Sequence, residues 1–547
     1  MASLLDAARV GDLDCLRGLI DSQADIEVRD IDGNSALIWA ADLGHTSCVE
    51  LLVESKANLE VCGFHMKTAL ICAAEHGHTA CAQLLINARA NFEARDEYGN
   101  TALLFAACYG HRACLQLLID AKADIEAKDN TEKTAIFLSA VYGHIDCVQL
   151  LIDVKAFVDS EDNGCNTALT KASWSGRTAC VELLLNAKAA VTAADFEGNN
   201  GLMWAASQGH LECMQLLLDA KACVETANHN GVTSLMRAAS GGHTACVQLL
   251  LDVNANVHVE DTFCETALIW AVKKGHATCA QLLLDAKADL SVKNYFGKTA
   301  LILAATHGHA ECVRVLVDAK ADLNSEDKIG NTVLLLASAN GHEQCVQLLL
   351  NAKADIQAKS NGGNTALISA SRRDHAVCVQ LLINSNADIH TIDGEGNSAL
   401  MIAAYEGAAV CLKLLLDAKA AIDAKNVHGK TALMLSAQKG HTSCARSLVY
   451  SKADLETKDE DGKTALMWAA VNGDVACVRL LLDAKANDEA TDVDGKAALI
   501  WATETGDVEC VQHLVDVETQ LNSSKPIEII PLWKRLLRNV FSYLRIF

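Results

Sequence analysis

The stretch Asn100–Asp129, NTALLFAACYGHRACLQLLIDAKADIEAKD, recurs along the chain at a constant spacing of 33 residues. A cysteine column shows the register best. It reads Cys15, Cys48, Cys81, Cys114, Cys147, Cys180, Cys213, Cys246, Cys279, Cys312, Cys345, Cys378, Cys411, Cys444, Cys477 and Cys510. A glycine column runs from Gly11 to Gly506, with Asp374 as its exception, and a histidine usually follows the glycine. Such a period indicates stacked supersecondary units, none of which can bury its apolar face alone.

Each copy predicts a helix, a turn, a second helix and a polar loop. Residues 102–108 place Leu103, Ala106 and Ala107 at helical spacing, and Gly110 is suited to end that helix. The second helix has apolar residues on more than one side, as expected for a helix packed between neighbours. The loop has turn residues at its tip in most copies. The predicted fold class is therefore all-α, with paired short helices and projecting hairpin loops.

With these columns in place, the chain resembles the ankyrin-repeat family, whose pattern is D-x-x-G-x-T-x-L-x-x-A-A-x-x-G-H-x-x-x-V-x-L-L-L. In one copy this pattern stands as Asp459, Gly462, Thr464, Leu466, Ala469, Ala470, Gly473, Val478, Leu480, Leu481 and Leu482. The resemblance covers residues 1–518, about sixteen repeats with the first as a partial N-terminal cap, and leaves 519–547 as a tail. It implies a curved α-solenoid whose loops and first helices form a concave protein-binding face.

The chain departs from the family pattern in three columns. Alanine replaces the proline after the threonine in most copies, at little cost because alanine is the best helix former. The family's histidine two residues further on is absent, so its bond to the threonine is not expected. After the second helix, Lys or Arg replaces glycine in twelve copies, from Lys56 to Lys485. A left-handed backbone there costs on the order of 1 kcal/mol. A cation at a helix C-terminus offsets roughly 0.3–1 kcal/mol of that cost.

Composition restricts the class of protein. Of 547 residues, 51% are hydrophobic, and both prolines lie in the last 22 residues, so no linker interrupts the repeats. The N-terminus fits the repeat register and not a signal peptide, and no run of 18 apolar residues occurs. We therefore expect a cytoplasmic protein, with the membrane periphery or the nucleus as alternatives.

The 22 cysteines allow two interpretations. Metal or redox chemistry is suggested by His76, His78 and Cys81, which are closely spaced. Against it, free cysteine behaves as a small hydrophobe, and column neighbours would lie about 8–10 Å apart, beyond the ~7 Å limit for a disulfide. We predict a reduced, buried column in an intracellular protein. Surface thiols are expected among the off-column residues Cys62, Cys72, Cys108, Cys165, Cys223 and Cys264.

The sequence offers no catalytic constellation. Gly297-Lys298-Thr299 resembles the end of a phosphate loop, but the first glycine of that motif is missing. The histidine column has eleven equivalent members, whereas catalysis needs one unique arrangement, so we interpret it as structural. The prediction is a non-enzymatic protein with no catalytic, cofactor-binding or metal-ligating residues and no cofactor.

Columns that vary between copies are the candidates for function. One of them, two residues after the first-helix leucine, holds five of the seven tryptophans: Trp39, Trp204, Trp270, Trp468 and Trp501. Two interpretations stay open, exposed interface anchors or rings packed between successive first helices. Aromatic residues before the glycine and at the hairpin tips are further candidates. The predicted protein-binding residues are Tyr98, Phe105, Tyr109, Tyr142, Trp174, Trp204, His229, Trp270, Tyr295, Phe296, Tyr405 and His428.

Charge narrows the partner class. The chain has 46 basic and 69 acidic residues and a net charge of −23. The tail has five basic residues and one acidic residue, so the repeats carry −27. Such a body repels phosphate backbones, which excludes nucleic acid and favours basic proteins as partners. We expect a monomeric array.

The tail segment 531–547, PLWKRLLRNVFSYLRIF, places apolar and basic residues on opposite helical stripes. Its candidate contact residues are Trp533, Lys534, Arg535, Arg538, Phe541 and Arg545. It is interpreted as a C-terminal cap, a membrane-surface helix or a docking motif. The predicted function is a non-enzymatic scaffold or adaptor for partner proteins. The alternatives are a membrane-peripheral adaptor and a substrate-recruiting subunit of a ubiquitin ligase, although no convincing ligase-recruiting box is present.

Overall fold

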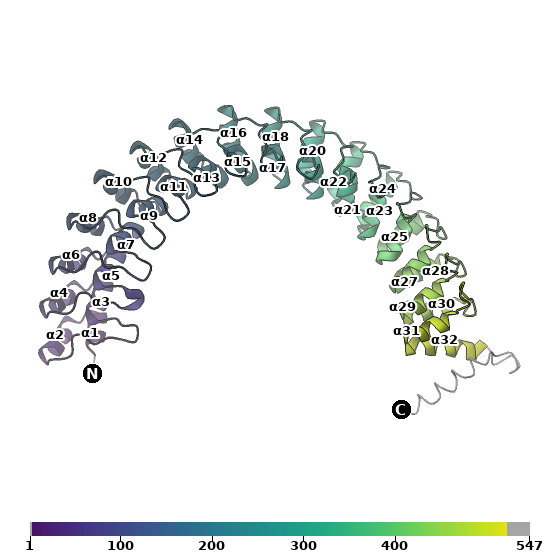
Figure 1. Cartoon of the computed structure of the whole chain (residues 1–547), viewed down its shortest axis with the longest axis horizontal. Helices are drawn as coiled ribbons and strands as arrows, with labels where there is room; N and C mark the ends of the chain where they lie inside the picture. The colour runs from purple at the N-terminus through teal and green to yellow at the C-terminus, as the bar shows by residue number, and fades with distance from the viewer. Residues whose placement is uncertain (1–2, 522–547) are drawn as a thin grey trace, which may run out of the picture. The chain divides into compact units, whose positions relative to one another are not determined.

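The computed structural model describes residues 3–521, which form stacked pairs of short helices (Figure 1). Its contacts divide the chain into two compact units, unit 1 from Met1 to Asp289 and unit 2 from Leu290 to Phe547. All regular structure in residues 3–521 is helical, apart from isolated β-bridges at hairpin bases such as Arg29 with Ser35. The all-α prediction is confirmed. The predicted array of residues 1–518 is divided by this boundary, and its last helix continues to Leu521.

Unit 1 contains nine helix pairs within its described residues. The first helices are α1 (Leu4–Val10), α3 (Ala36–Asp42), α5 (Ala69–Glu75), α7 (Ala102–Tyr109), α9 (Ala135–Tyr142), α11 (Ala168–Trp174), α13 (Gly201–Gln208), α15 (Ser234–Gly241) and α17 (Ala267–Lys273). The second helices are α2 (Leu13–Asp21), α4 (Thr46–Glu54), α6 (Thr79–Asn87), α8 (Arg112–Asp120), α10 (Ile145–Asp153), α12 (Thr178–Asn186), α14 (Leu211–Asp219), α16 (Thr244–Asp252) and α18 (Ala277–Asp285). One hairpin also holds a 3-10 turn, η1 (Phe64–Met66).

Unit 2 contains seven helix pairs within its described residues. The first helices are α19 (Ala300–Thr306), α21 (Val333–Ala339), α23 (Ala366–Arg372), α25 (Ala399–Glu406), α27 (Ala432–Lys439), α29 (Ala465–Asn472) and α31 (Ala498–Thr505). The second helices are α20 (Ala310–Asp318), α22 (Glu343–Asn351), α24 (Ala376–Asn384), α26 (Ala409–Asp417), α28 (Thr442–Tyr450), α30 (Val475–Asp483) and α32 (Val508–Leu521). Within each unit the first helices share one side with the hairpin tips, a surface called here the first-helix face (Figure 1).

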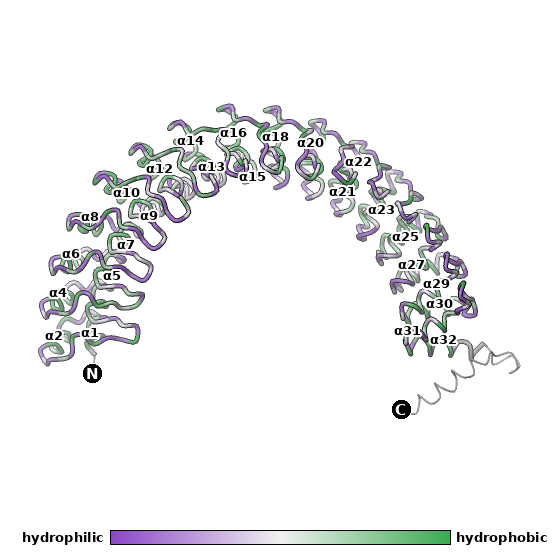
Figure 2. The backbone as a smooth tube through the Cα atoms, viewed as in Figure 1, coloured by the Kyte–Doolittle hydropathy of each residue, from purple (hydrophilic) through white to green (hydrophobic). Residues whose placement is uncertain are grey.

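Recurrent residues begin and end the helices. The Thr101 hydroxyl accepts a hydrogen bond from the backbone N–H of Leu104 and so caps α7, and Gly110 ends that helix with a left-handed backbone at φ 77°. Figure 2 shows that hydrophilic residues gather in the loops that join the helices. The local sequence therefore fixes where each short helix starts and stops.

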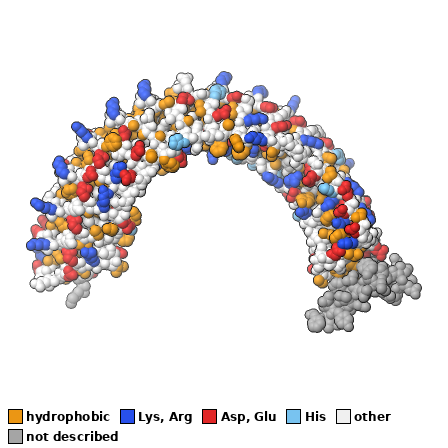
Figure 3. All heavy atoms as spheres, in the orientation of Figure 1, with side chains coloured by type: hydrophobic (Ala, Val, Ile, Leu, Met, Phe, Trp, Pro, Cys, Tyr) orange, Lys and Arg blue, Asp and Glu red, His pale blue; other side chains and the backbone are white. Residues whose placement is uncertain are grey.

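The Lys and Arg residues after the second helices adopt a left-handed backbone, the costly conformation that the family pattern reserves for glycine at this position. All twelve have positive φ, between 63° for Lys56 and 71° for Lys122. The Lys122 N–H donates to the carbonyl of Ile119 at 2.9 Å, so the turn satisfies one of the last carbonyls of α8. Figure 3 shows Lys and Arg side chains projecting at regular intervals along unit 1.

The cysteine column lies in the core. Fifteen of its sixteen members are buried, and Cys15 in the first repeat is half-buried. Burial raises the pKa of Cys180 to about 11, so this thiol stays protonated at neutral pH. Neighbouring repeats also contact one another through this column, for example where the Thr79 hydroxyl lies 3.3 Å from the Cys114 sulfur. The core prediction is confirmed.

The histidine column joins each repeat to the preceding one. His111 Nε2 lies 2.9 Å from the carbonyl oxygen of Glu75, a bond in which the ring nitrogen donates. The imidazole packs against Gly77, where an added Cβ would lie 2.5 Å from Nδ1. Gly77 also has φ 72°, so this position requires glycine for both its backbone and its space. The histidines therefore have the structural role that their repetition predicted.

Candidate protein-binding surfaces

The tryptophan column is tied to the hairpins by a repeated hydrogen bond. Each indole N–H donates to the carboxylate nine residues earlier, at 2.8–3.0 Å. The pairs are Trp39 with Asp30, Trp204 with Asp195, Trp270 with Asp261, Trp468 with Asp459 and Trp501 with Asp492. All five rings are half-buried, so they are neither free anchors nor fully packed between helices.

These hydrogen bonds affect the acid as well as the ring. Burial alone would raise the pKa of Asp30, but bonds from Asn34 and Trp39 hold that pKa below its usual value. The carboxylate is therefore negatively charged at neutral pH and accepts hydrogen bonds from the side chains of Asn34 and Trp39. This pairing was not predicted from the sequence, although every tryptophan of the column has an aspartate nine residues before it.

Cations of the chain cover several of the rings. Arg9 lies 5.1 Å from the Trp39 ring centre, and Arg237 lies 5.8 Å from that of Trp204. In unit 2 lysines and tryptophans alternate in space, and this set is called here the lysine–tryptophan ladder. It consists of Lys430, Trp468, Lys463, Trp501 and Lys496, and each lysine Nζ lies 3.8–4.9 Å from the centre of a neighbouring tryptophan ring. Burial lowers the pKa of Lys430. The ladder was not predicted, although its lysines recur in the sequence at 33-residue spacing, each one residue before a helix cap.

Polar side chains brace the base of a hairpin against the end of the same first helix, eight residues further on. Lys67 pairs with Glu75 at 2.5 Å, and the same positions are occupied with reversed charge by Glu265 and Lys273, at 2.9 Å. In unit 2, Lys496 pairs with Glu504 at 2.7 Å. The repeated geometry makes these pairs structural braces.

The structure places most predicted contact residues on the surface. Tyr98, Tyr109, Tyr142, Trp174, Tyr295, Phe296, His229 and His428 are exposed, and Trp204, Trp270 and Tyr405 are half-buried. Phe105 is buried, which corrects its proposed role as an exposed anchor. The reason is local, because Lys67 of the preceding repeat lies 4.8 Å from its ring centre and Tyr109 stacks on it at 6.3 Å.

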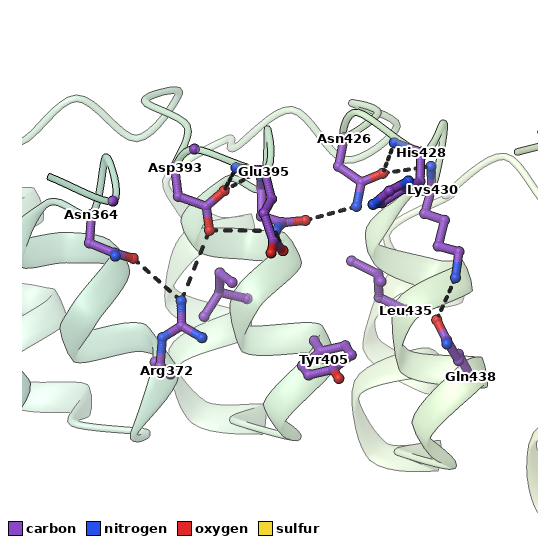
Figure 4. Close-up of a pocket in the computed structure, with 14 residues that line it drawn as sticks. Asn364, Arg372, Asp393, Glu395, Tyr405, Asn426, His428, Lys430, Leu435 and Gln438 are labelled. Atoms are coloured by element: carbon purple, nitrogen blue, oxygen red, sulfur yellow. Dashed lines mark hydrogen bonds and ion pairs between the residues drawn. The ribbon is translucent and has the colours of Figure 1, made fainter. Parts of the chain in front are cut away.

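Unit 2 has a hollow of about 590 Å³ on its first-helix face. Figure 4 shows Arg372 pointing toward Asn364 and Asp393, with N–O distances of 3.3 and 4.0 Å. On the opposite side Lys430 points toward Gln438, to which it donates at 2.9 Å. The lining is mainly polar, and its charged groups already have partners within the chain.

The comparison with protein families follows the repeat register. A match to ankyrin repeats, in blocks of three copies, recurs over residues 4–96, 57–129, 123–195, 187–261, 253–327, 321–393, 378–459 and 448–525. The chain belongs to the ankyrin-repeat family. Ankyrin repeats bind other proteins, and this chain is therefore a protein-interaction scaffold.

Other comparisons add little to the ankyrin assignment. Among solved structures, the crystal structure of the human ASB11 ankyrin repeat domain matches with 28% identity over 40% of this chain and 98% of that chain, at a TM-score of 0.38. None of the curated proteins matches this sequence.

Several remaining expectations concern cysteines, metals and the tail of the ankyrin chain. Cys62, Cys165 and Cys223 are exposed, as expected for some off-column thiols. Within residues 3–521 no three His, Cys, Asp or Glu side chains are grouped to hold a metal ion, and no helix is long and apolar enough to cross a membrane. The tail candidates Trp533, Lys534, Arg535, Arg538, Phe541 and Arg545 lie outside the described residues.

Proposed function

We propose that unit 1 is the arm with which this scaffold binds a basic partner protein. The contact surface is an aromatic strip on the first-helix face, which consists of Tyr98, Tyr109, Tyr142 and Trp174. These side chains are 43–55% exposed, and they come from three neighbouring repeats. Exposed Tyr and Trp side chains are typical anchors of protein interfaces, because they present a large apolar area with a polar group.

The rings of the strip are held in place before any partner arrives. Tyr109 stacks on Phe105 and His111 at 6.3 Å, and Tyr142 stacks on His144 at 6.4 Å. The neighbouring Cys108 side chain raises the pKa of Tyr142. Side chains that are already ordered lose less conformational entropy on binding, which favours affinity.

Charge supports a basic partner for this unit. Residues 1–289 contain 38 acidic and 20 basic residues, a net charge of −18. Such a surface attracts positively charged proteins and accelerates their association, most strongly at low salt. All 22 cysteines are free, which supports a reducing compartment such as the cytoplasm.

The test is quantitative affinity capture with the full chain from cells that express it. The variant Tyr109→Ser with Tyr142→Ser is compared with Phe157→Ser, which removes an exposed aromatic ring from a loop after a second helix of the same unit. We expect basic partners to be lost from the double variant and retained by the control. An unchanged set of captured proteins would reject the strip as the contact surface.

We propose as the second candidate a membrane-peripheral adaptor, because the sequence of 531–547 combines a Trp-containing apolar stripe with basic residues. Vesicles with anionic lipid are floated with the full chain and with a chain that ends at Ser524. Flotation of the full chain alone supports the anchor. Equal behaviour of the two chains contradicts it.

A further inference from the structure

A hollow of about 260 Å³ opens between the second and third repeats of unit 1, and it is called here the Trp39 pocket. Aromatic rings contribute two of its walls, from Trp39 and Phe64. Asp32, Asp42 and the buried Cys72 also line it. The pocket therefore combines apolar rings with negative charge.

An irregular hairpin forms one side of this pocket. The third repeat has Gly63 where the family pattern has aspartate, and a Cβ there would lie 2.1 Å from the Asn34 side-chain oxygen. His65 of this hairpin has a positive φ of 54°, whereas the positive φ of 61° at Met66 recurs at the same position of the other hairpins. The Phe64 N–H donates to Asn34 at 3.0 Å, which fixes the hairpin while its ring stays 55% exposed.

The chain contains a filled counterpart of this pocket. Trp204 occupies the same column as Trp39, and Arg237 occupies the same column as Cys72, each 33 residues after its tryptophan. The Arg237 guanidinium lies 5.8 Å from the Trp204 ring centre and donates to the Asn199 oxygen at 3.0 Å. In the Trp39 pocket a small thiol replaces that arginine.

The charges around the Trp39 pocket favour a cation. Glu75 is neutralised by Lys67, whereas Asp42 pairs with a histidine, His76, at 3.3 Å. Asp32 forms no ion pair with a lysine or arginine within residues 3–521. Arg9 already lies 5.1 Å from the Trp39 ring centre, so the ring interacts with a guanidinium within the chain.

We propose that the Trp39 pocket binds an arginine side chain of the partner protein, in the place that Arg237 fills beside Trp204. The guanidinium packs against the Trp39 ring and donates to Asp42, and an apolar neighbour of that arginine packs on Phe64. Arginine is preferred to lysine, because its planar group stacks on aromatic rings and pairs with carboxylates through two donors. This inference rests on the proposed function and names the chemistry that one part of unit 1 recognises.

The test starts from peptides selected on the full chain from a random phage-displayed library of 12-residue peptides. We expect the selected peptides to share an arginine next to an apolar residue. Affinities are then measured by fluorescence anisotropy with one selected peptide. Its Arg→Lys version and the chain variant Asp42→Asn should each bind about tenfold more weakly, the loss of a charge-assisted hydrogen bond.

The decisive variant is Cys72→Arg, which supplies the missing guanidinium from the chain itself. We expect it to block the peptide, while Cys72→Ala leaves the pocket open and binding intact. Circular dichroism checks that both variants fold, and the exposed substitution Asp146→Asn on α10 is the charge control. Asp42→Asn leaves an isosteric side chain, so it tests the same site if Cys72→Arg does not fold.

Two results would overturn the inference. One is a set of selected peptides without a shared arginine. The other is a peptide that binds the wild-type chain, Cys72→Arg and Asp42→Asn equally well. If partner capture is nevertheless lost with the Tyr109→Ser and Tyr142→Ser variant, the proposed function stands and the pocket alone is rejected.

Discussion

Units 1 and 2 share one repeat frame but differ in the columns that the frame leaves free. At the end of the first helices, unit 1 has Tyr109 and Tyr142, whereas the same column in unit 2 has Asn340, Arg373 and Lys439. Residues 290–518 carry 30 acidic and 21 basic residues, a net charge of −9 against −18 for unit 1. The buried Cys and Leu columns and the Gly column are common to both. Repeat proteins of this kind can therefore keep one core and change their partner surface repeat by repeat.

The lysine–tryptophan ladder of unit 2 and the aromatic strip of unit 1 also differ in how far other side chains of the chain cover their rings. In unit 2 the rings of Trp468 and Trp501 each have two lysines nearby. In unit 1 the rings of Tyr98, Tyr109 and Tyr142 are about half exposed. We infer that the lysine–tryptophan ladder contributes to stability, and that the aromatic strip contributes to binding.

The largest expected effects concern the glycine column, which should respond alike in both units. Gly77→Ala and Gly341→Ala each place a Cβ 2.5 Å from a histidine Nδ1, at a backbone φ of 72° or 73°. The histidine cannot move away without losing its bond to the preceding repeat. We expect each change to lower the free energy of unfolding by about 2–4 kcal/mol, from left-handed strain and overpacking. Urea denaturation of the full chain measures it.

The control for this prediction is Gly506→Ala. Gly506 has φ 77°, but an added Cβ has no neighbour within 4 Å, so only the backbone strain of about 1 kcal/mol remains. Equal losses at Gly506 and Gly77 would show that the histidine contact contributes nothing. A large loss at Gly77 with none at Gly341 would show that the two units do not share one frame.

An intermediate effect is expected when a ring is removed from the lysine–tryptophan ladder. Trp468→Leu removes a hydrogen bond to Asp459 and the contacts with Lys430 and Lys463, and should cost about 2 kcal/mol of stability. Trp174→Leu in unit 1 removes a 43% exposed ring and should change stability by less than about 0.5 kcal/mol. Thermal melts of both variants measure the difference. The comparison of the units fails if Trp174→Leu is the more destabilising change.

The fold could be predicted from the sequence because its signal repeats in every copy. The Cys and Gly columns give the register, and the position after the second helix, where the family has glycine, has a left-handed backbone despite its lysine. The surface was predictable only in part. Phe105 was a candidate contact residue but is buried, and its burial depends on Lys67 in the preceding repeat. The spacing of residues within one repeat does not show which side chains of two neighbouring repeats meet.

The Trp39 pocket was missed for a related reason. Gly63 breaks the D-x-x-G pattern at one hairpin, which is visible in the sequence, but the hollow also needs the short Cys72 side chain. The pairing of each tryptophan with an aspartate nine residues earlier was visible as well. The structure shows why this spacing recurs, because the hairpin base lies beside the middle of the first helix and the aspartate there accepts a hydrogen bond from the tryptophan.

The smallest expected effect concerns the brace between Lys67 and Glu75, which tests whether the free columns are independent of one another. Glu75→Lys places two like charges together and should cost about 1 kcal/mol, since both side chains are largely buried. The double change Lys67→Glu with Glu75→Lys should recover most of that loss, because Glu265 and Lys273 have the reversed order in the same unit. A double-mutant cycle in urea measures the coupling. If the reversed pair is as unstable as the single variant, the brace depends on its surroundings, and the free columns of unit 1 cannot be exchanged between repeats.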